Sequence, residues 1–135
     1  MDKKKKITII TVVKNAENTL DNCIKSILSQ NYNNLEYIVI DGNSSDRTKE
    51  IINKYKNNIS RIIIEGDDGI WDAMNKGIKL ADGEIIGFLN SDDYYFNNTL
   101  EIVNKYFSKN DIDFLFGSVE KYKLMHGYSP WKILW

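Results

Sequence analysis

Short runs of β-branched and other apolar residues alternate along the chain with longer segments whose apolar residues recur at helical spacing. The continuous apolar run at 7–13 is typical of a strand that is covered on both faces. Apolar runs predict strands at 7–13, 36–40, 61–65, 84–89 and 113–118. Helical periodicity predicts helices at 19–29, 45–55, 70–81 and 98–108. This alternation indicates βαβ units and a mostly parallel sheet, and therefore an α/β fold.

The length and composition indicate one globular domain. The chain has 135 residues, of which 42% are apolar and 27% charged, as in an ordinary folded domain. We expect a single domain over 1–135, with its core at about 6–118 and with 119–135 as a tail or the start of a further region. The 18 basic and 19 acidic side chains give a net charge of −1, which offers no general attraction to nucleic acid.

The cysteine content and the N-terminal residues suggest where the protein works. The only cysteine, Cys23, cannot form an internal disulfide, so a reducing cytoplasm is expected. Lys3–Lys6 precedes an apolar run of about seven residues, which is followed by Lys14 rather than by a cleavage site. We therefore expect Lys3–Lys6 to be a solvated tail; the alternative is contact with anionic lipid at the inner face of the cell membrane.

Acidic side chains follow the predicted strands at four separate places. These are Glu17, Asp41, the Glu65–Asp68 stretch and the Asp92-Asp93 pair. Because the carboxyl ends of parallel strands meet at one edge of a sheet, we expect these acids to gather there. Such crowding is unfavourable without a cation, and Lys14 and Lys76 are the only candidates nearby. A bound Mg²⁺ or Mn²⁺ with oxygen ligands would resolve the repulsion.

Several of these acids also have an explanation that involves no ligand. Asp41 precedes Gly42 and could form a turn, whereas Asp67 could cap the helix that follows it. Asn75 is a poor helix former in the middle of a predicted helix, so it either reaches a ligand or faces water. The Asp92-Asp93 pair lies too far from the next predicted helix to cap it, which favours a functional role.

Four segments resemble family 2 glycosyltransferases, most of all the bacterial enzymes that build surface polysaccharides. They are T-V-V-K-N-A-E-N-T-L (11–20), I-V-I-D-G-N-S-S-D-R-T (38–48), D-D-G-I-W-D-A-M-N-K-G-I (67–78) and G-E-I-I-G-F-L-N-S-D-D (83–93). The resemblance covers about 6–118. It implies a GT-A fold, which is a Rossmann-like three-layer sandwich around a mostly parallel sheet, here truncated, that binds a nucleotide-diphospho-sugar.

The resemblance also implies roles for individual residues. Asp41 would contact the nucleotide base, and the family's D-x-D motif falls on Asn90-Ser91-Asp92. Asp92 would hold Mn²⁺ or Mg²⁺ with support from Asp93, and the amide of Asn90 leaves one charge fewer at the ion. The residues implied to bind the nucleotide-sugar are Val13, Asn15, Glu17, Asp41, Asp67, Asn75, Ser91 and Asp92.

The implied reaction is transfer of a sugar, with inversion, to an acceptor hydroxyl during polysaccharide or glycoconjugate synthesis. The acceptor would be a saccharide or a lipid-linked molecule. The family's general base lies beyond the D-x-D motif, and the later acids Asp111, Asp113 and Glu120 lack its context. We therefore assign no catalytic residue. The alternative function is a non-catalytic nucleotide-sugar-binding fragment or assembly module.

Other α/β classes fit less well. A dinucleotide-binding fold needs glycines after the first strand, and a phosphoacceptor signalling domain needs an acidic pair there. This chain has Lys14 and Asn15 at that point. Near its end the chain carries Tyr122, Tyr128, Trp131 and Trp135. If exposed, these side chains would form an apolar patch that favours a homodimer.

Overall fold

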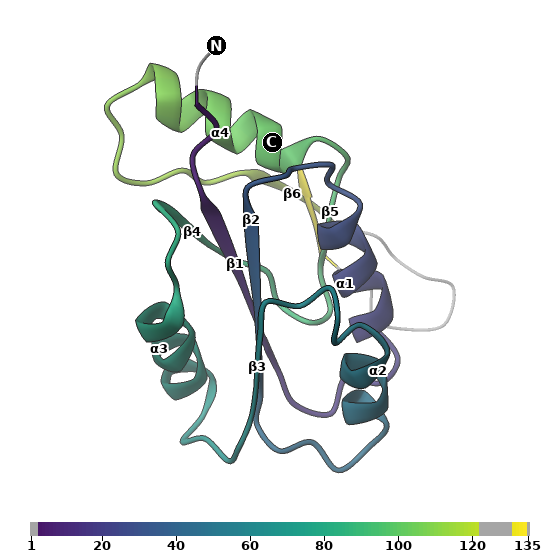
Figure 1. Ribbon diagram of the computed structural model, residues 1–135. Coiled ribbons are helices and arrows are strands. Elements are labelled where there is room, and N and C mark those ends of the chain that lie inside the picture. Colours follow the sequence, from purple (N-terminus) through teal and green to yellow (C-terminus); the bar gives the residue numbers. More distant parts are fainter. Residues whose placement is uncertain (1–2, 122–130, 135) are drawn as a thin grey trace.

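The protein is a three-layer α/β sandwich, described here from a computed structural model that defines residues 3–121 and 131–134 (Figure 1). A four-stranded parallel sheet has the order β3-β2-β1-β4. Helix α3 covers one face of this sheet, and α1 and α2 cover the other. The strands are β1 (Ile7–Val13), β2 (Leu35–Asp41), β3 (Arg61–Ile64) and β4 (Ile85–Phe88). The helices are α1 (Leu20–Leu28), α2 (Thr48–Lys54), α3 (Ile70–Leu80) and α4 (Thr99–Lys109).

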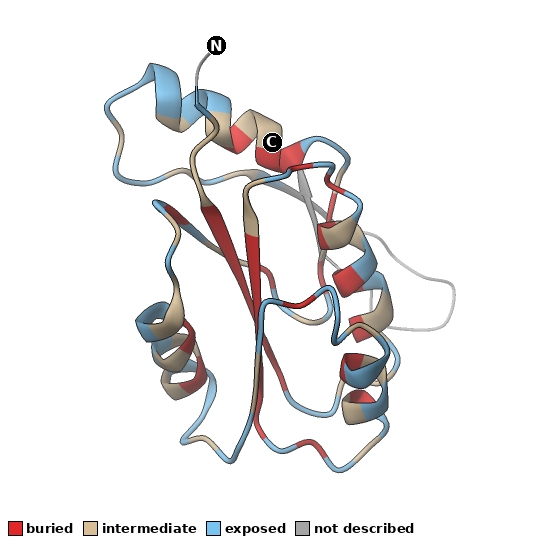
Figure 2. Ribbon diagram, in the orientation of Figure 1, coloured by how far each residue is buried: buried red, intermediate tan, exposed pale blue. Residues whose placement is uncertain are grey.

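The two central strands form the most buried part of the molecule (Figure 2). Every residue of β1 is buried, as the continuous apolar run predicts. The ladder with β2 runs from Ile7, paired with Leu35, to Val13, paired with Asp41. It continues one step past the strands, since the Gly42 N–H donates to the Val13 carbonyl. The carboxyl ends of β1 and β2 are therefore fixed side by side.

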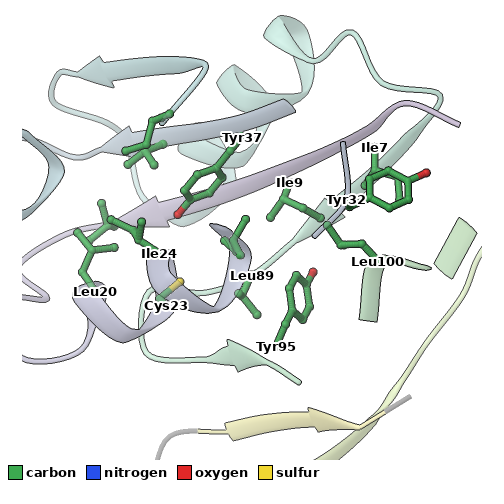
Figure 3. Packing of buried hydrophobic residues seen from close by; sticks show 14 of the residues in the cluster. Ile7, Ile9, Leu20, Cys23, Ile24, Tyr32, Tyr37, Leu89, Tyr95 and Leu100 are labelled. Atoms are coloured by element: carbon green, nitrogen blue, oxygen red, sulfur yellow. The ribbon is translucent and has the colours of Figure 1, made fainter. Parts of the chain in front are cut away.

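The sheet separates two hydrophobic clusters of different size. The larger one lies under α1 and α2, where Ile9, Ile24 and Tyr37 pack together with Cys23 (Figure 3). The smaller one lies under α3 and is centred on Ile10. Cys23 of α1 is fully buried in the larger cluster.

The N-terminal lysines are paired with acidic side chains and do not form a solvated tail. Lys4 forms an ion pair with Glu101 of α4, and the Lys5 Nζ lies 3.4 Å from Glu84. The Lys6 Nζ lies 4.0 Å from the buried carboxylate of Glu36. The expectation of a free tail was therefore wrong for these three residues, because their acidic partners come from distant parts of the sequence.

The end of the described chain differs most from the sequence prediction. No strand forms at 113–117, where Phe114 and Phe116 are 80% and 89% exposed. Pairing begins only at β6 (Ser118–Lys121), which is antiparallel to β7 (Trp131–Leu134). β7 also pairs in parallel with the short strand β5 (Tyr94–Tyr95), so a second sheet has the order β5-β7-β6. The predicted strand at 113–118 was wrong because an apolar run does not determine where a partner strand begins.

The predicted dimer patch and the question of a membrane-spanning helix remain to be compared with the structure. Tyr122, Tyr128 and Trp135 of the predicted dimer patch lie outside the described residues, so the homodimer stays a prediction. Over 3–121 and 131–134, no helix has both the length and the apolar character needed to cross a bilayer.

The close approach of α3 to the sheet can be tested at Gly77. A Cβ atom added at Gly77 would lie 2.6 Å from Cγ2 of the buried Ile10. Gly77→Ala gains about 1 kcal/mol in helix propensity, but overpacking a filled core costs about 1–3 kcal/mol. We expect a net loss of roughly 1 kcal/mol in the free energy of unfolding, measured with urea. Lys79→Ala on the exposed side of α3 is the control, and a more stable Gly77→Ala variant would contradict the packing.

Candidate functional site

A cleft of about 630 Å³ opens at the carboxyl edge of the parallel sheet. Three segments line it: the end of β1 with the loop that follows, the N-terminal part of α3 with the preceding loop, and the turn after β4. Their lining residues include Val13, Asn15, Asp67, Ser91 and Asp92. These five are separated by up to about eighty positions in the sequence, so the α/β topology brings them together, as expected for this edge.

Asp67 reaches the cleft from the loop between β3 and α3. Its Oδ1 accepts a hydrogen bond of 3.0 Å from the Gly69 N–H, and the residue is half-buried. Its Oδ2 lies over Gly42, where an added Cβ atom would be only 2.5 Å away. Gly42 is therefore required for space. The alternative role of Asp67 as a helix cap is not observed, since no side chain caps α3.

The turn after β4 directs its two acids differently. Asp92 is exposed and lines the cleft, whereas Asp93 is buried and lies near Cys23, whose pKa its charge helps to raise. Burial is the main cause that raises the pKa of the Cys23 thiol to about 12. The thiol is therefore protonated and donates to the Asn90 carbonyl at 3.4 Å. Cys23 thus anchors the start of the turn that carries Asp92.

Asp41, at the end of β2, does not line the cleft but stabilises one of the loops that do. Its carboxylate is fully buried and accepts hydrogen bonds from the Ser44 N–H and hydroxyl. The Ser44 Oγ in turn accepts a 2.8 Å hydrogen bond from the Asn15 N–H, and the Asn15 Oδ1 accepts one of 2.8 Å from the Ser45 N–H. Asn15 has a φ of 52°, a backbone conformation that asparagine tolerates. This chain of contacts fixes the loop after β1 relative to the loop after β2.

Glu17 makes a second link between the same two loops. The Arg47 N–H donates to the Glu17 carboxylate at 2.9 Å, and the Glu17 N–H donates to Asp46 at 3.1 Å. Asp46 also accepts a hydrogen bond from the Thr48 N–H in the first turn of α2. Glu17 therefore acts within the protein in this structure and does not line the cleft.

The predicted site residues thus fall into two groups. Val13, Asn15, Asp67, Ser91 and Asp92 line the cleft, whereas Glu17, Asp41, Asn75 and Asp93 do not. Asn75 is exposed on α3, as one of its two interpretations allows. Lys14, Asn18, Thr19 and Asn90 also line the cleft but were not among the residues implied to bind the nucleotide-sugar, although Lys14 was expected nearby as a cation and Asn90 as part of the D-x-D position. Their position within the motifs at 11–20 and 83–93 was the available signal.

The cleft offers few ligands for a metal ion. Among the described residues, no three His, Cys, Asp or Glu side chains are close enough together to hold one. The cleft presents the carboxylates of Asp67 and Asp92 together with the Ser91 hydroxyl. Mg²⁺ and similar ions are commonly held by one or two carboxylates plus substrate phosphates. These residues therefore fit an ion that a bound diphosphate helps to coordinate, and they do not form an all-protein cage.

The link between the two loops gives a stability prediction. Ser44→Ala removes the hydroxyl that donates to the buried Asp41 and accepts from Asn15, so unfolding should become easier by about 1–3 kcal/mol. Ser45→Ala is a matched control, because Ser45 is exposed and its hydroxyl makes only a 3.4 Å contact with Asn15. Urea unfolding of both variants measures the difference, and equal stabilities would show that the network contributes little.

Comparison with curated proteins finds bacterial glycosyltransferases. The Escherichia coli UDP-Glc:alpha-D-GlcNAc-diphosphoundecaprenol beta-1,3-glucosyltransferase WfgD is 36% identical over 115 residues, which are 84% of this chain and 46% of WfgD. Glycosyltransferase GlyG of Streptococcus pneumoniae is 30% identical over 119 residues, 86% of this chain and 40% of GlyG. The chain thus spans less than half the length of these relatives.

Comparison with solved structures finds glycosyltransferases whose fold is similar to that of this chain. S. aureus TarS 1–349 in complex with UDP-GlcNAc matches with a TM-score of 0.69 and 27% identity over 77% of this chain and 31% of TarS 1–349. A mannosyltransferase from Pyrobaculum calidifontis, in complex with GDP-Man and Mn²⁺, matches with a TM-score of 0.67 and 21% identity over 76% of this chain and 31% of its own. The four-stranded parallel sheet is that of the GT-A glycosyltransferases. The family model for glycosyl transferase family 2 matches residues 8–135, and the chain therefore belongs to this family.

Proposed function

We propose that this chain binds a nucleotide-diphospho-sugar in the cleft and forms the donor-binding part of an enzyme that transfers the sugar to an acceptor hydroxyl. The observation that carries the proposal is the meeting of Asp67, Asp92 and the Val13–Ala16 backbone around one cleft. The volume of about 630 Å³ is in the usual range for small-molecule sites. The relatives named for UDP-Glc and solved with UDP-GlcNAc support the same class of donor.

The diphosphate of the donor would lie between the start of α3 and the turn after β4. Gly69 and Ile70, at the N-terminus of α3, line the cleft. The first backbone N–H groups of a helix and its dipole both favour a negative group. Asp67 would accept hydrogen bonds from ribose or sugar hydroxyls, and Asn15, whose Oδ1 already accepts from the Ser45 N–H, would donate through its amide NH₂. Asp41 and Glu17 would contribute by fixing the loop that carries Asn15.

Asp92 would hold Mn²⁺ or Mg²⁺ together with phosphate oxygens of the donor. The Ser91 hydroxyl is a further oxygen ligand in the cleft, and Asp93 would support the turn from its buried position. Such an ion would act as a Lewis acid that stabilises the charge on the departing nucleoside diphosphate. The Mn²⁺ complex of the Pyrobaculum mannosyltransferase supports this assignment.

For the acceptor we propose a saccharide attached to a lipid diphosphate, handled at the cytoplasmic face of the membrane with inversion at the transferred sugar. The name of WfgD, which specifies a diphosphoundecaprenol substrate, supports this acceptor class. Inversion requires a base that takes the proton of the acceptor hydroxyl. Asp111 and Asp113 are exposed and do not line the cleft. We therefore propose that the general base comes from residues that do not line the cleft.

Donor binding can be tested by calorimetry with UDP-glucose, UDP-GlcNAc and GDP-mannose, each with and without Mn²⁺. We expect one or more of them to bind, and more tightly with Mn²⁺. Asp92→Asn should abolish the Mn²⁺-dependent gain in affinity because it removes the metal-binding charge. Glu50→Gln on the exposed face of α2 is a control for loss of one charge. If none of the three donors binds, the proposed function is wrong; binding without donor hydrolysis would favour the non-catalytic binding module.

A second test concerns the space that Gly42 leaves for Asp67. Gly42→Ala places a Cβ atom 2.5 Å from Asp67 Oδ2, so the carboxylate must move from its present position. We expect donor affinity to fall by roughly tenfold or more, since the loss of one hydrogen bond to a charged group costs about 1.5–3 kcal/mol. Ser45→Ala, in the same loop as Gly42, is the control because Ser45 is exposed and does not line the cleft. Equal donor affinity in the two variants would show that Asp67 does not contribute to donor binding.

A further inference from the structure

The loop that presents Asp67 lacks support from hydrophobic packing. From Ile64 to Asp72 no residue is buried, and the next buried side chain is Ala73 in α3. Gly66 and Gly69 add conformational freedom, and Gly69 adopts a φ of +104°. Polar contacts must therefore determine the shape of this loop.

Lys76 supplies three of these contacts from the second turn of α3. Its Nζ lies 3.1 Å from Glu65, 3.1 Å from Asp72 and 3.2 Å from the Gly66 carbonyl oxygen. A lysine ammonium has three N–H donors, and here each has an acceptor. Glu65 and Gly66 lie at the start of the loop, so the ammonium group ties this end of the loop to the helix, whereas Asp72 lies in the first turn of α3.

Asp72, one of the three acceptors of Lys76, also contacts the loop directly. The Asp72 carboxylate also accepts a 3.2 Å hydrogen bond from the Asp68 N–H, next to Asp67. Hydrogen bonds to Glu65 and Asp72 raise the pKa of Lys76, while hydrogen bonds from the Asp68 backbone and from Lys76 lower that of Asp72. Both groups therefore keep their charges around neutral pH, and the contacts persist.

We propose that Lys76 is a positioning residue for donor binding, which holds the Glu65–Gly69 loop so that Asp67 faces the cleft. This inference rests on the proposed function, because it needs Asp67 to contact the donor. Lys76 itself does not line the cleft, so it acts through the loop. Its ion pairs are partly exposed to solvent, and exposed pairs contribute little to folding. If Lys76 served only to stabilise the fold, its replacement would accordingly change neither the melting temperature nor donor affinity by much.

The test compares Lys76→Met, Lys76→Arg and Lys79→Met. Lys79 is exposed on the same helix and makes no hydrogen bond or ion pair with other described residues, so Lys79→Met controls for loss of one charge. With whichever of UDP-glucose, UDP-GlcNAc and GDP-mannose the unaltered chain binds, Lys76→Met should weaken binding about tenfold, within the range of coupled neighbouring sites. Lys76→Arg should recover part of this loss, and the melting temperature should change little in all three variants.

Hydrogen–deuterium exchange of the ligand-free chain separates loop order from donor binding. We expect faster exchange at 65–72 in Lys76→Met, with the central strands unchanged, and no effect in Lys79→Met. The inference is overturned if the unaltered chain binds a donor and Lys76→Met binds it equally well, or if exchange at 65–72 does not change. Failure of the unaltered chain to bind any of the three donors would instead refute the proposed function.

Discussion

The pairing of β1 with β2 is the constraint on which the rest of the structure depends. Both strands are buried almost throughout, and their ladder extends without a break to Val13, Asp41 and Gly42. Because the side chains on both faces are packed, the register cannot shift without moving apolar residues out of their clusters. The positions where the two loops leave the sheet are therefore fixed. The cleft at this edge is a consequence of that register.

The three loops around the cleft are held in three different ways. The loop after β1 is fixed by side chain–backbone hydrogen bonds to the loop after β2, in which Ser44 donates to the buried Asp41 at the end of β2. The turn after β4 rests on the hydrophobic cluster through Cys23 and Asp93. The loop before α3 has neither support and depends on exposed polar contacts. Of the three segments, the one that carries Asp67 therefore has the least support from packing.

Acidic residues serve two purposes at this edge of the sheet. Asp41 and Glu17 accept hydrogen bonds from the backbone and hydroxyl groups of neighbouring loops, so their charge is compensated inside the protein. Asp67 and Asp92 face the cleft and leave negative charge for a ligand. Burial explains the two extremes, because the buried Asp41 carboxylate needs donors from the protein, whereas the exposed Asp92 carboxylate is open to a ligand. Glu17 and Asp67 are both half-buried and differ in their partners.

The sequence by itself determined the α/β class, four parallel strands, four helices and the edge where the site lies, since periodicity and strand order depend on local pattern and on general rules of topology. The motifs also determined the family. Only the tertiary structure decided that Asp41 and Glu17 support the cleft and that Lys4–Lys6 are paired, because hydrogen bonds between distant loops leave no periodic signal. It also replaced the predicted strand at 113–118 by pairing from Ser118 onward. A strand forms only where the backbone groups of a neighbouring strand can pair with it. For β6 that neighbour is β7, which only the folded chain brings alongside.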